Sequence, residues 1–416
     1  MINSLTSFLI RKKRLQSKLT IGDASTKIGV DKTYLSKLEN NKSIPSERRL
    51  KQIYHLYNMK SYNVSYIDFN ELFINNFLNK IYYIDVSEND IINLDKMIEK
   101  HQSSIYLGHL ILLKWCYKSL KGLWDNEFLS DINGFLSSFN LLSDEEQNFF
   151  LLCFLFYCVR SKNFDKYNRY LPNLNKINKH KWLGLEYYII VNYDYYTNNY
   201  LEMPKHIEKA KKYLLKDKNY KRLNSTLQYE GIYYNIVRDY EKELNIYHSL
   251  IETYKKSNQL INYGVTKQNI ASLLLEQKKY DEAIENFLEG LKYNSLNGPY
   301  FELAWCYYNI NEMDLCKNAI EQGKNAKKQI PYYNDFLDWL FKMTESPYSK
   351  SCLNLLLKID KKYNSTLTSD MKNFLNVAIA NNYIKLNQID HAYDYLKKTI
   401  DESLPLTVKV FNHYGE

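Results

Sequence analysis

The chain is poor in the residues that interrupt helices, with only 12 glycines and 7 prolines among 416 residues. Few breakers in so long a chain predict an all-α fold, in which helices are joined by short turns. The cysteines form no CxxC pair and show no metal-binding spacing with histidine, which argues against a disulfide framework or a zinc module. We expect all six to be buried free thiols: Cys116, Cys153, Cys158, Cys306, Cys316 and Cys352.

The sequence also lacks an apolar run long enough to cross a membrane. Its longest run, residues 149–159, falls well short of the roughly 20 residues that a transmembrane helix needs. The short apolar stretch at the N-terminus precedes its basic cluster at residues 11–14, whereas a secretory signal has the opposite order. We interpret residues 149–159 as a buried helix and expect a cytoplasmic protein without a membrane partner.

Motifs of catalysis are missing as well. HExxH, GxSxG, Walker A and GxGxxG do not occur, and the eight histidines are scattered. The acidic pairs Glu145-Glu146 and Glu282-Glu285 look like solvated helix surface. We therefore expect no enzymatic activity, no cofactor and no metal site.

What the chain does have is a basic N-terminus. Residues 1–60 hold 13 Lys or Arg against 4 Asp or Glu, which accounts for the whole net charge of +9. The remaining residues are balanced in charge. A small basic module on a neutral body is typical of a polyanion binder, the alternative being an ordinary solvated surface.

These first sixty residues read as four short helices. Thr20 can cap the second helix with Asp23 as its capping-box partner, and Gly29 ends it. Asp31 can cap the third helix, and the fourth begins at residues 45–46. The apolar positions of the first and fourth helices are Leu5, Phe8, Leu9, Leu15, Leu50, Ile53, Leu56 and Tyr57.

The third helix has the two faces that major-groove entry requires, an apolar one that docks and a polar one that reaches base edges. Val30, Leu35 and Leu38 form the apolar set. This segment resembles the lambda-repressor-like (XRE-type) helix-turn-helix family in Leu19-Thr20, Ile28-Gly29-Val30, residues 34–40, Lys42 and Pro45-Ser46. The resemblance implies DNA contacts from Lys32, Thr33, Ser36, Lys37, Asn41 and Lys42.

Two departures from this family stand out. Ile21 replaces a glutamine that is common there, and Asn41 replaces the usual glycine after the recognition helix. Asparagine tolerates the left-handed conformation, so we expect the turn to be kept. The alternative is a four-helix module that mediates pairing and does not bind DNA.

The rest of the chain reads as a repeat array. Residues 269–287 resemble a tetratricopeptide repeat, with small Ala271 and Ala283 where paired helices touch and large Tyr280 and Phe287 where pairs stack. Weaker copies predict eight or nine helix pairs in a right-handed superhelix. We therefore expect a helix-turn-helix domain at residues 1–62 and a tetratricopeptide-like domain for peptide binding and dimerisation at residues 66–416.

In this repeat family the first helix of each pair lines the concave groove. Carboxamides there can pair with the backbone of an extended peptide, and aromatic rings can contact its side chains. Helical spacing selects Asn192, Gln228, Asn235, Gln268, Trp305, Tyr308 and Asn381 as peptide-binding candidates, and we add the adjacent Asn269 and Asn309. Asn and Tyr are abundant throughout the chain, so such a stripe is partly expected by chance.

An XRE-type module followed by a tetratricopeptide array resembles the Rap–Rgg–NprR–PlcR–PrgX superfamily of quorum-sensing receptors. The resemblance implies a homodimeric transcription regulator whose binding to a pseudo-palindromic operator is switched by a short signalling peptide. A phosphatase-like or phosphotransfer-blocking role, as in the Rap branch, stays open without a catalytic residue to assign. The alternatives are a tetratricopeptide interaction scaffold, or an XRE-type phage repressor or antitoxin with a different ligand.

Overall fold

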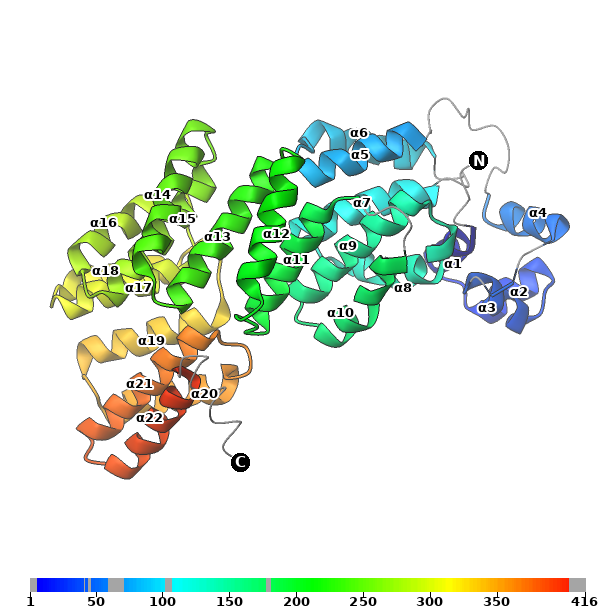
Figure 1. Ribbon diagram of the computed structural model, residues 1–416. Helices are drawn as coiled ribbons and strands as arrows, with labels where there is room; N and C mark the ends of the chain where they lie inside the picture. The colour runs from blue at the N-terminus through cyan, green and yellow to red at the C-terminus, as the bar shows by residue number, and fades with distance from the viewer. Residues whose placement is uncertain are drawn as a thin grey trace, which may run out of the picture. The chain divides into compact units, whose positions relative to one another are not determined.

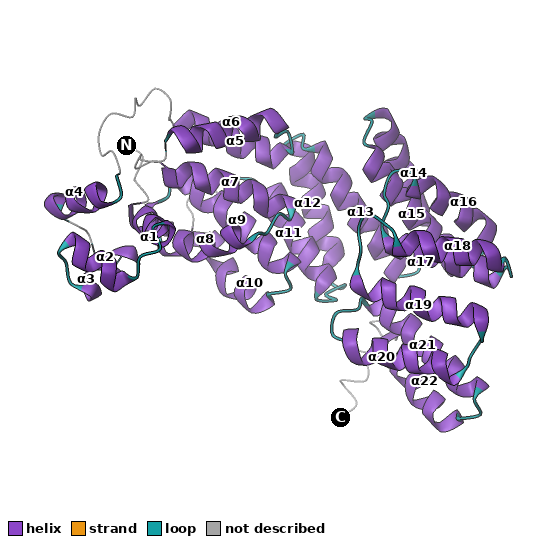
Figure 2. Cartoon of the chain, turned by 180° about the vertical axis from the view of Figure 1, so that it is seen from behind, coloured by secondary structure: helices purple, strands orange, loops and turns teal. Residues whose placement is uncertain are grey.

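The computed structural model describes residues 6–40, 42–43, 46–58, 71–101, 107–176 and 181–403 (Figure 1). Within these residues, Figure 2 shows helices and no strand. The chain divides into two compact units, Met1–Thr226 and Leu227–Glu416. The predicted all-α class is confirmed, and each unit is described by itself.

The first unit begins with a four-helix head, which we define as α1 to α4. These helices are α1 (Thr6–Gln16), α2 (Ile21–Ile28), α3 (Lys32–Glu39) and α4 (Glu47–Leu56). The predicted capping box is present, since the Asp23 amide donates to the Thr20 hydroxyl and the Thr20 amide donates to the Asp23 carboxylate, both at 3.1 Å. Gly29 ends α2 in the left-handed conformation at φ 72°, which glycine adopts without strain.

The core of the head is built mainly as the sequence predicts. Leu35, Leu38 and Ile53 have no exposed area. Asp31 caps α3 and Ser46 caps α4, each through its side-chain oxygen. Leu15 lies on α1 as predicted, but at the last turn of the helix its side chain is 52% exposed. Leu5, Asn41 and Pro45, and the side chain of Leu50, lie outside the described residues.

Four helix pairs follow the head in the first unit. In the third of these pairs, α10 is extended by a 3-10 helix, Leu171–Lys176. The predicted buried helix is α9, where Phe149 to Leu155 are at most 1% exposed. No described helix meets the length and apolarity that a membrane span requires. The helices are α5 (Glu71–Tyr83), α6 (Glu88–Lys100), α7 (Leu107–Lys121), α8 (Asn126–Ser137), α9 (Asp144–Arg160), α10 (Phe164–Tyr170), α11 (Leu183–Tyr196) and α12 (Met203–Lys216).

The pairing continues through the second unit, so that residues 71–403 hold nine pairs in their described part. The turns within pairs repeat one conformation, with Arg238, Lys278, Asn311 and Asn387 all at φ between 58° and 66°. The helices are α13 (Tyr220–Ile236), α14 (Tyr240–Lys256), α15 (Leu260–Glu276), α16 (Tyr280–Leu291), α17 (Asn297–Asn309), α18 (Met313–Lys324), α19 (Pro331–Glu345), α20 (Lys350–Tyr363), α21 (Ser369–Lys385) and α22 (Ile389–Ser403).

The packing residues of the clearest repeat lie where the sequence places them. The small Ala271 and Ala283 and the large Phe287 have no exposed area. At Gly264 the backbones approach so closely that a Cβ atom would lie 2.8 Å from the carbonyl oxygen of Gly290. All six cysteines are buried free thiols, as predicted.

Candidate DNA interface and ligand-facing helices

The recognition helix α3 presents its polar face to solvent. Lys32, Thr33 and Lys37 are exposed and Ser36 is half-buried, whereas Leu35 and Leu38 on the opposite face are buried. Lys42, just after the helix, is also exposed. Asn41, the remaining DNA-contact candidate, lies outside the described residues. The helix therefore offers cationic and hydroxyl groups at the spacing that base edges and phosphates require.

A buried ion pair fixes this helix to α1. The Arg14 guanidinium donates to both carboxylate oxygens of Glu39, at 2.7 and 2.9 Å, and to the carbonyl oxygen of Leu19 at 2.9 Å. Arg14 is 7% exposed and Glu39 is 2% exposed. The hydrogen bond to Glu39 raises the pKa of Arg14. A fork-like pair of this kind fixes orientation as well as distance, so it sets the angle at which α3 stands on the head.

The turn before α3 is held from a second side. Arg49, on α4, donates to the carbonyl oxygen of Gly29 at 2.9 Å and to the side chain of Gln52 at 3.0 Å. The carbonyl at the end of α2 lacks a helical partner, and the guanidinium supplies one. The sequence identified Arg14 and Arg49 only as part of the basic excess and gave no signal of these structural roles.

The head is packed against the repeats through α1. The Phe8 ring stacks on Phe135 of α8, with centroids 4.4 Å apart and planes 17° apart. Gly134 makes this contact possible, because a Cβ atom there would lie 2.5 Å from the Phe8 ring. Phe8 is 2% exposed and belongs to one core with residues of α7 and α9. The head and the first repeats thus share a hydrophobic core.

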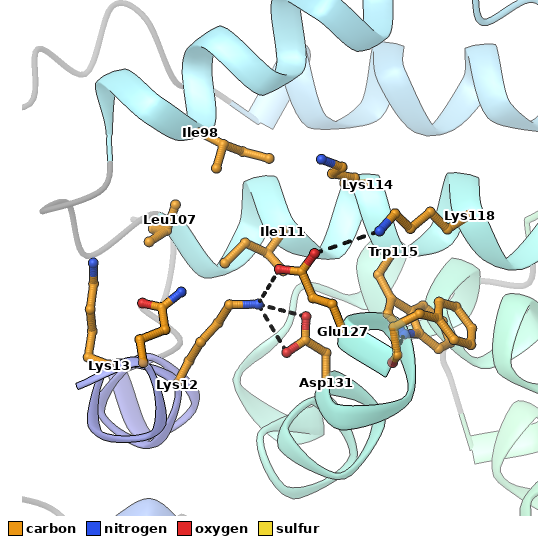
Figure 3. A pocket seen from close by; sticks show the side chains of 12 residues that line it. Lys12, Lys13, Ile98, Leu107, Ile111, Lys114, Trp115, Lys118, Glu127 and Asp131 are labelled. Carbon is orange, nitrogen blue, oxygen red and sulfur yellow. Dashed lines mark hydrogen bonds and ion pairs between the residues drawn. The ribbon is translucent and has the colours of Figure 1, made fainter. Parts of the chain in front are cut away.

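A polar contact lies beside the stacked rings. Figure 3 shows Lys12 reaching from α1 to α8, where its ammonium is 2.8 Å from Asp131 and 3.3 Å from Glu127. Burial raises the pKa of Asp131, although Lys12 opposes this effect. A cavity of about 270 Å³ adjoins the pair, with Ile111 of α7 among its lining residues. Lys13 also lines this cavity. Burial, followed in size by the charge of the neighbouring Lys12, lowers the pKa of Lys13. We call the contacts of Phe8 and Lys12 with α8 the junction.

Several peptide-binding candidates form one polar network in the second unit. The Gln228 amide of α13 donates to the Thr266 hydroxyl of α15 at 3.0 Å and to the Tyr254 hydroxyl at 3.4 Å. Asn269 of α15 donates back to the Gln228 oxygen at 3.4 Å. Gln228 and Asn269 are both half-buried, so part of each amide stays at the surface.

Two further candidates make strong contacts with their own fold. Gln268 is 5% exposed and exchanges two hydrogen bonds of 2.8 Å with Asn294. Asn235 donates to Glu243 at 3.2 Å and to Glu276 at 3.4 Å. Burial, with Glu276 nearby, raises the pKa of Glu243 to about 7. Gln268 therefore ties α15 to the segment that follows α16, and Asn235 bridges two carboxyl groups.

The aromatic candidates lie together on α17. The Trp305 ring stacks with Tyr308 at 5.5 Å between centroids and 12° between planes, and also with Trp339 of α19 at 5.7 Å. The exposed Asn309 donates to the Trp305 carbonyl oxygen at 2.7 Å. Trp305 and Tyr308 are half-buried, so they present part of an apolar surface.

The last two candidates differ in their surroundings. Asn381 of α21 is exposed. Asn192 of α11 has no exposed area, and its amide donates to the Tyr188 carbonyl oxygen at 2.7 Å. A side chain so enclosed cannot touch a ligand without rearrangement of α11, and it belongs to the first unit whereas the other candidates lie in the second.

The expectation that Glu146 is solvated surface was wrong. Its side chain is 1% exposed and lies 2.6 Å from Nδ1 of the fully buried His109. Although burial opposes the effect, hydrogen bonds from His109 and from the Ser143 cap lower the pKa of Glu146 overall. The Ser143–Glu146 spacing predicts a capping box, which is present, but it does not predict the burial of this carboxylate, since His109 comes from another helix.

Comparisons with known proteins agree with this architecture. Residues 10–61 match the family model described as Helix-turn-helix, a range that contains most of α1 and all of α2, α3 and α4. No curated protein matches the chain in sequence. The head is therefore a helix-turn-helix module of the XRE type predicted from the sequence.

Solved structures of the same fold extend over most of the chain. The apo form of the quorum sensor NprR from B. thuringiensis has a TM-score of 0.62 and 14% identity, covering 80% of this chain and 97% of that one. NprR in complex with its cognate peptide NprX has a TM-score of 0.59 at 14% identity, covering 82% and 99%. The apo form of RapI has 0.54 at 14% identity, covering 79% and 97%. The predicted fold, a helix-turn-helix head followed by a tetratricopeptide-type array, is confirmed.

Proposed function

We propose that this protein is a transcription regulator that binds a DNA operator through α3 and is controlled by a short peptide held on the first helices of its repeats. The observation that carries the proposal is the exposed face of α3, with Lys32, Thr33 and Lys37, within the first sixty residues, which hold the whole cationic excess. Phosphate neutralisation by such a head supplies affinity, and side chains in the major groove supply specificity.

The ligand part of the proposal rests on the repeats. The half-buried amides of Gln228 and Asn269 and the partly exposed rings of Trp305 and Tyr308 lie on α13, α15 and α17, which are first helices of their pairs. An extended peptide can pair its backbone with the amides and pack its side chains on the rings. NprR, whose fold is similar, has been solved with a cognate peptide. We include the exposed Asn309 and Asn381, and we leave out the enclosed Asn192.

Control also requires a mechanical connection between ligand and DNA. The junction provides one within the first unit, because Phe8 and Lys12 tie α1 to α8, while Arg14 ties α1 to α3. A shift of α8 would therefore move the recognition helix. We propose that the protein acts as a homodimer on a pseudo-palindromic operator, so that such shifts change the spacing of two heads. The division into functional domains at residues 1–62 and 66–416 belongs to the same proposal.

DNA binding is tested by fluorescence anisotropy with the full chain and the DNA upstream of its own gene. We expect Lys32→Ala and Lys37→Ala each to lower affinity by about 10- to 100-fold, the range for a base contact. Lys121→Ala is the control, since Lys121 is exposed in the first unit and lies outside the head. Equal affinity for a scrambled duplex, or an equal loss in the control, would rule out sequence-specific binding through α3.

Peptide binding is tested by calorimetry with C-terminal fragments of a short secreted precursor encoded beside the gene. Asn269→Ala should weaken binding about tenfold, as expected for the loss of one hydrogen-bonding amide. Asn286→Ala is the matched control, because Asn286 lies on α16, the second helix of the same pair, and is also half-buried. An equal effect of both variants would exclude the first-helix surface as the ligand site.

A further inference from the structure

A cavity of about 270 Å³ lies in the first unit, where α1 meets the first repeats. Figure 3 shows side chains of α1, α6, α7 and α8 around it. Its apolar wall includes Ile98 of α6 and Leu107 and Ile111 of α7. Leu107 is 5% exposed and Ile111 8%, and Ile98 packs against the same core. This wall is therefore part of the folded core and can hold an apolar group out of water.

The charged part of the lining carries more positive than negative groups. The lysines come from α1 and α7, and the acidic residues come from α8. These charged residues are Lys12, Lys13, Lys114, Lys118, Glu127 and Asp131. The cavity therefore has a cationic excess beside its apolar wall, and such an excess attracts anions.

Three of these four ammonium groups already have a carboxylate partner. The partners of Lys12, Lys114 and Lys118 are Asp131, Asp95 and Asp125, at 2.8, 2.6 and 2.7 Å respectively. Lys13 differs from them, because it is half-buried and forms no ion pair with any residue that the structure describes. Its charge is thus left uncompensated inside the cavity.

The surroundings of Lys13 favour the arrival of an anion. Burial and the charge of Lys12 both lower the pKa of Lys13, which means that they disfavour its charged form. A carboxylate beside the ammonium acts in the opposite direction, because an opposite charge stabilises the charged form. Gln16 lies one turn further along α1 and also lines the cavity, where its amide can donate a hydrogen bond to the same anion.

We propose that this cavity binds a small monocarboxylate with an apolar body. The carboxylate pairs with the Lys13 ammonium, and the apolar body lies against Leu107 and Ile111. One negative charge matches the one uncompensated ammonium, whereas Glu127 and Asp131 repel a second negative charge. The volume is just below the range of about 300–1,000 Å³ that is usual for small-molecule sites, so the ligand is small.

A ligand in this cavity touches α1 and α7 at the same time. It therefore adds a second connection between α1 and the first repeats, beside the junction, in which Phe8 and Lys12 tie α1 to α8. The site uses none of the residues proposed to contact DNA or peptide, so it stands apart from the proposed function. We expect the bound carboxylate to hold α1 more firmly on the repeats.

Calorimetry on the full-length chain, without DNA or peptide, tests the class of ligand. Benzoate and hexanoate are the probes, and we expect at least one to bind with a Kd on the order of 1 mM, as is usual for so small a ligand. Benzyl alcohol lacks the charge and acetate lacks the apolar body, so each should bind at least about tenfold more weakly. Tighter binding of phenyl phosphate than of benzoate would overturn the assignment of a monocarboxylate.

Variants of Lys13 test the location of the site. Lys13→Gln should weaken binding of the probe by about tenfold or more, the range for a hydrogen bond to a charged group, and Lys13→Arg should retain it. Lys121→Gln is the matched control, since Lys121 is exposed at the end of α7 and does not line the cavity.

Hydrogen exchange gives a readout that does not depend on the heat of binding. The bound probe should slow exchange in α1 of the parent and of Lys13→Arg, but not of Lys13→Gln. The proposal is overturned if neither probe binds at about 10 mM, ten times the expected Kd. Equal binding to Lys13→Gln and the parent, or binding that leaves exchange in α1 unchanged, would overturn it as well.

Discussion

The junction makes an asymmetric prediction about its two charged partners. In the Lys12→Met variant the Asp131 carboxylate, which is 7% exposed, stays beside Glu127 but loses its ion pair with the Lys12 ammonium. Removing one partner of a buried ion pair costs about 3–5 kcal/mol. Because both side chains keep a little exposure, we expect about 2–3 kcal/mol here. Asp131→Asn should lower the stability by less than about 1 kcal/mol, because Lys12 keeps its ion pair with Glu127 at 3.3 Å.

The pKa of Asp131 sets the sign of the pH dependence. Burial raises it in the folded state, so the protonated form is favoured by folding, and this group's contribution to stability is lost as pH rises through the folded pKa. The penalty of Lys12→Met should therefore shrink as pH falls through that pKa, because the carboxyl group becomes neutral. The Asp131→Asn protein should show no such change.

Hydrogen exchange of α1 in the full chain is the suitable assay, because two compact units need not unfold in one step. The ratio of exchange rates between variant and parent gives the change in opening free energy. Ser130→Ala on the exposed face of α8 serves as the control. If Asp131→Asn loosened α1 as much as Lys12→Met at neutral pH, the reasoning from burial would be refuted.

Three further predictions follow from other contacts. Raising ionic strength should lower operator affinity steeply, and Lys42→Ala should reduce the slope of log affinity against log salt, as expected for the loss of one phosphate contact. Glu243, with its pKa raised to about 7, contributes stability that is present below its unfolded pKa and is lost as pH rises toward 7 and above. Thermal melts at pH 5 and 8 should therefore differ more for the parent than for Glu243→Gln, and equal differences would contradict this. Gly264→Ala should destabilise the second unit by about 1–3 kcal/mol in urea titrations, because its Cβ would lie 2.8 Å from a backbone oxygen. Gly22→Ala, whose nearest atom would be at 3.7 Å, is the control.

The features that the sequence predicted correctly are local. The Thr20–Asp23 capping box and the Gly29 turn depend on residues three to five positions apart, and the two faces of α3 follow from helical spacing. The repeat register likewise rests on a local unit that recurs, with Ala271 and Ala283 buried where helices touch. Such signals need no knowledge of which helices meet.

The features that the sequence did not reveal are contacts between distant elements. Lys12 and Asp131 are 119 residues apart, and Arg14 and Glu39 are 25 apart. Nothing in their local pattern distinguishes these charges from solvated ones, because the partner comes from another helix. Glu146 was misread for the same reason, since His109 approaches from a different helix. The candidate DNA face could therefore be predicted, but the contacts that connect it to the repeats could not.

Footprinting of the full-length protein on the DNA upstream of its gene tests the central claim most directly. Two heads that insert α3 into successive major grooves should protect two related half-sites, with centres one or more helical turns apart, about 34 Å for each turn. Lys32→Ala and Lys37→Ala should abolish this protection at concentrations where Lys121→Ala retains it. Uniform protection of any duplex, or none at low salt, would contradict sequence-specific recognition by the basic head.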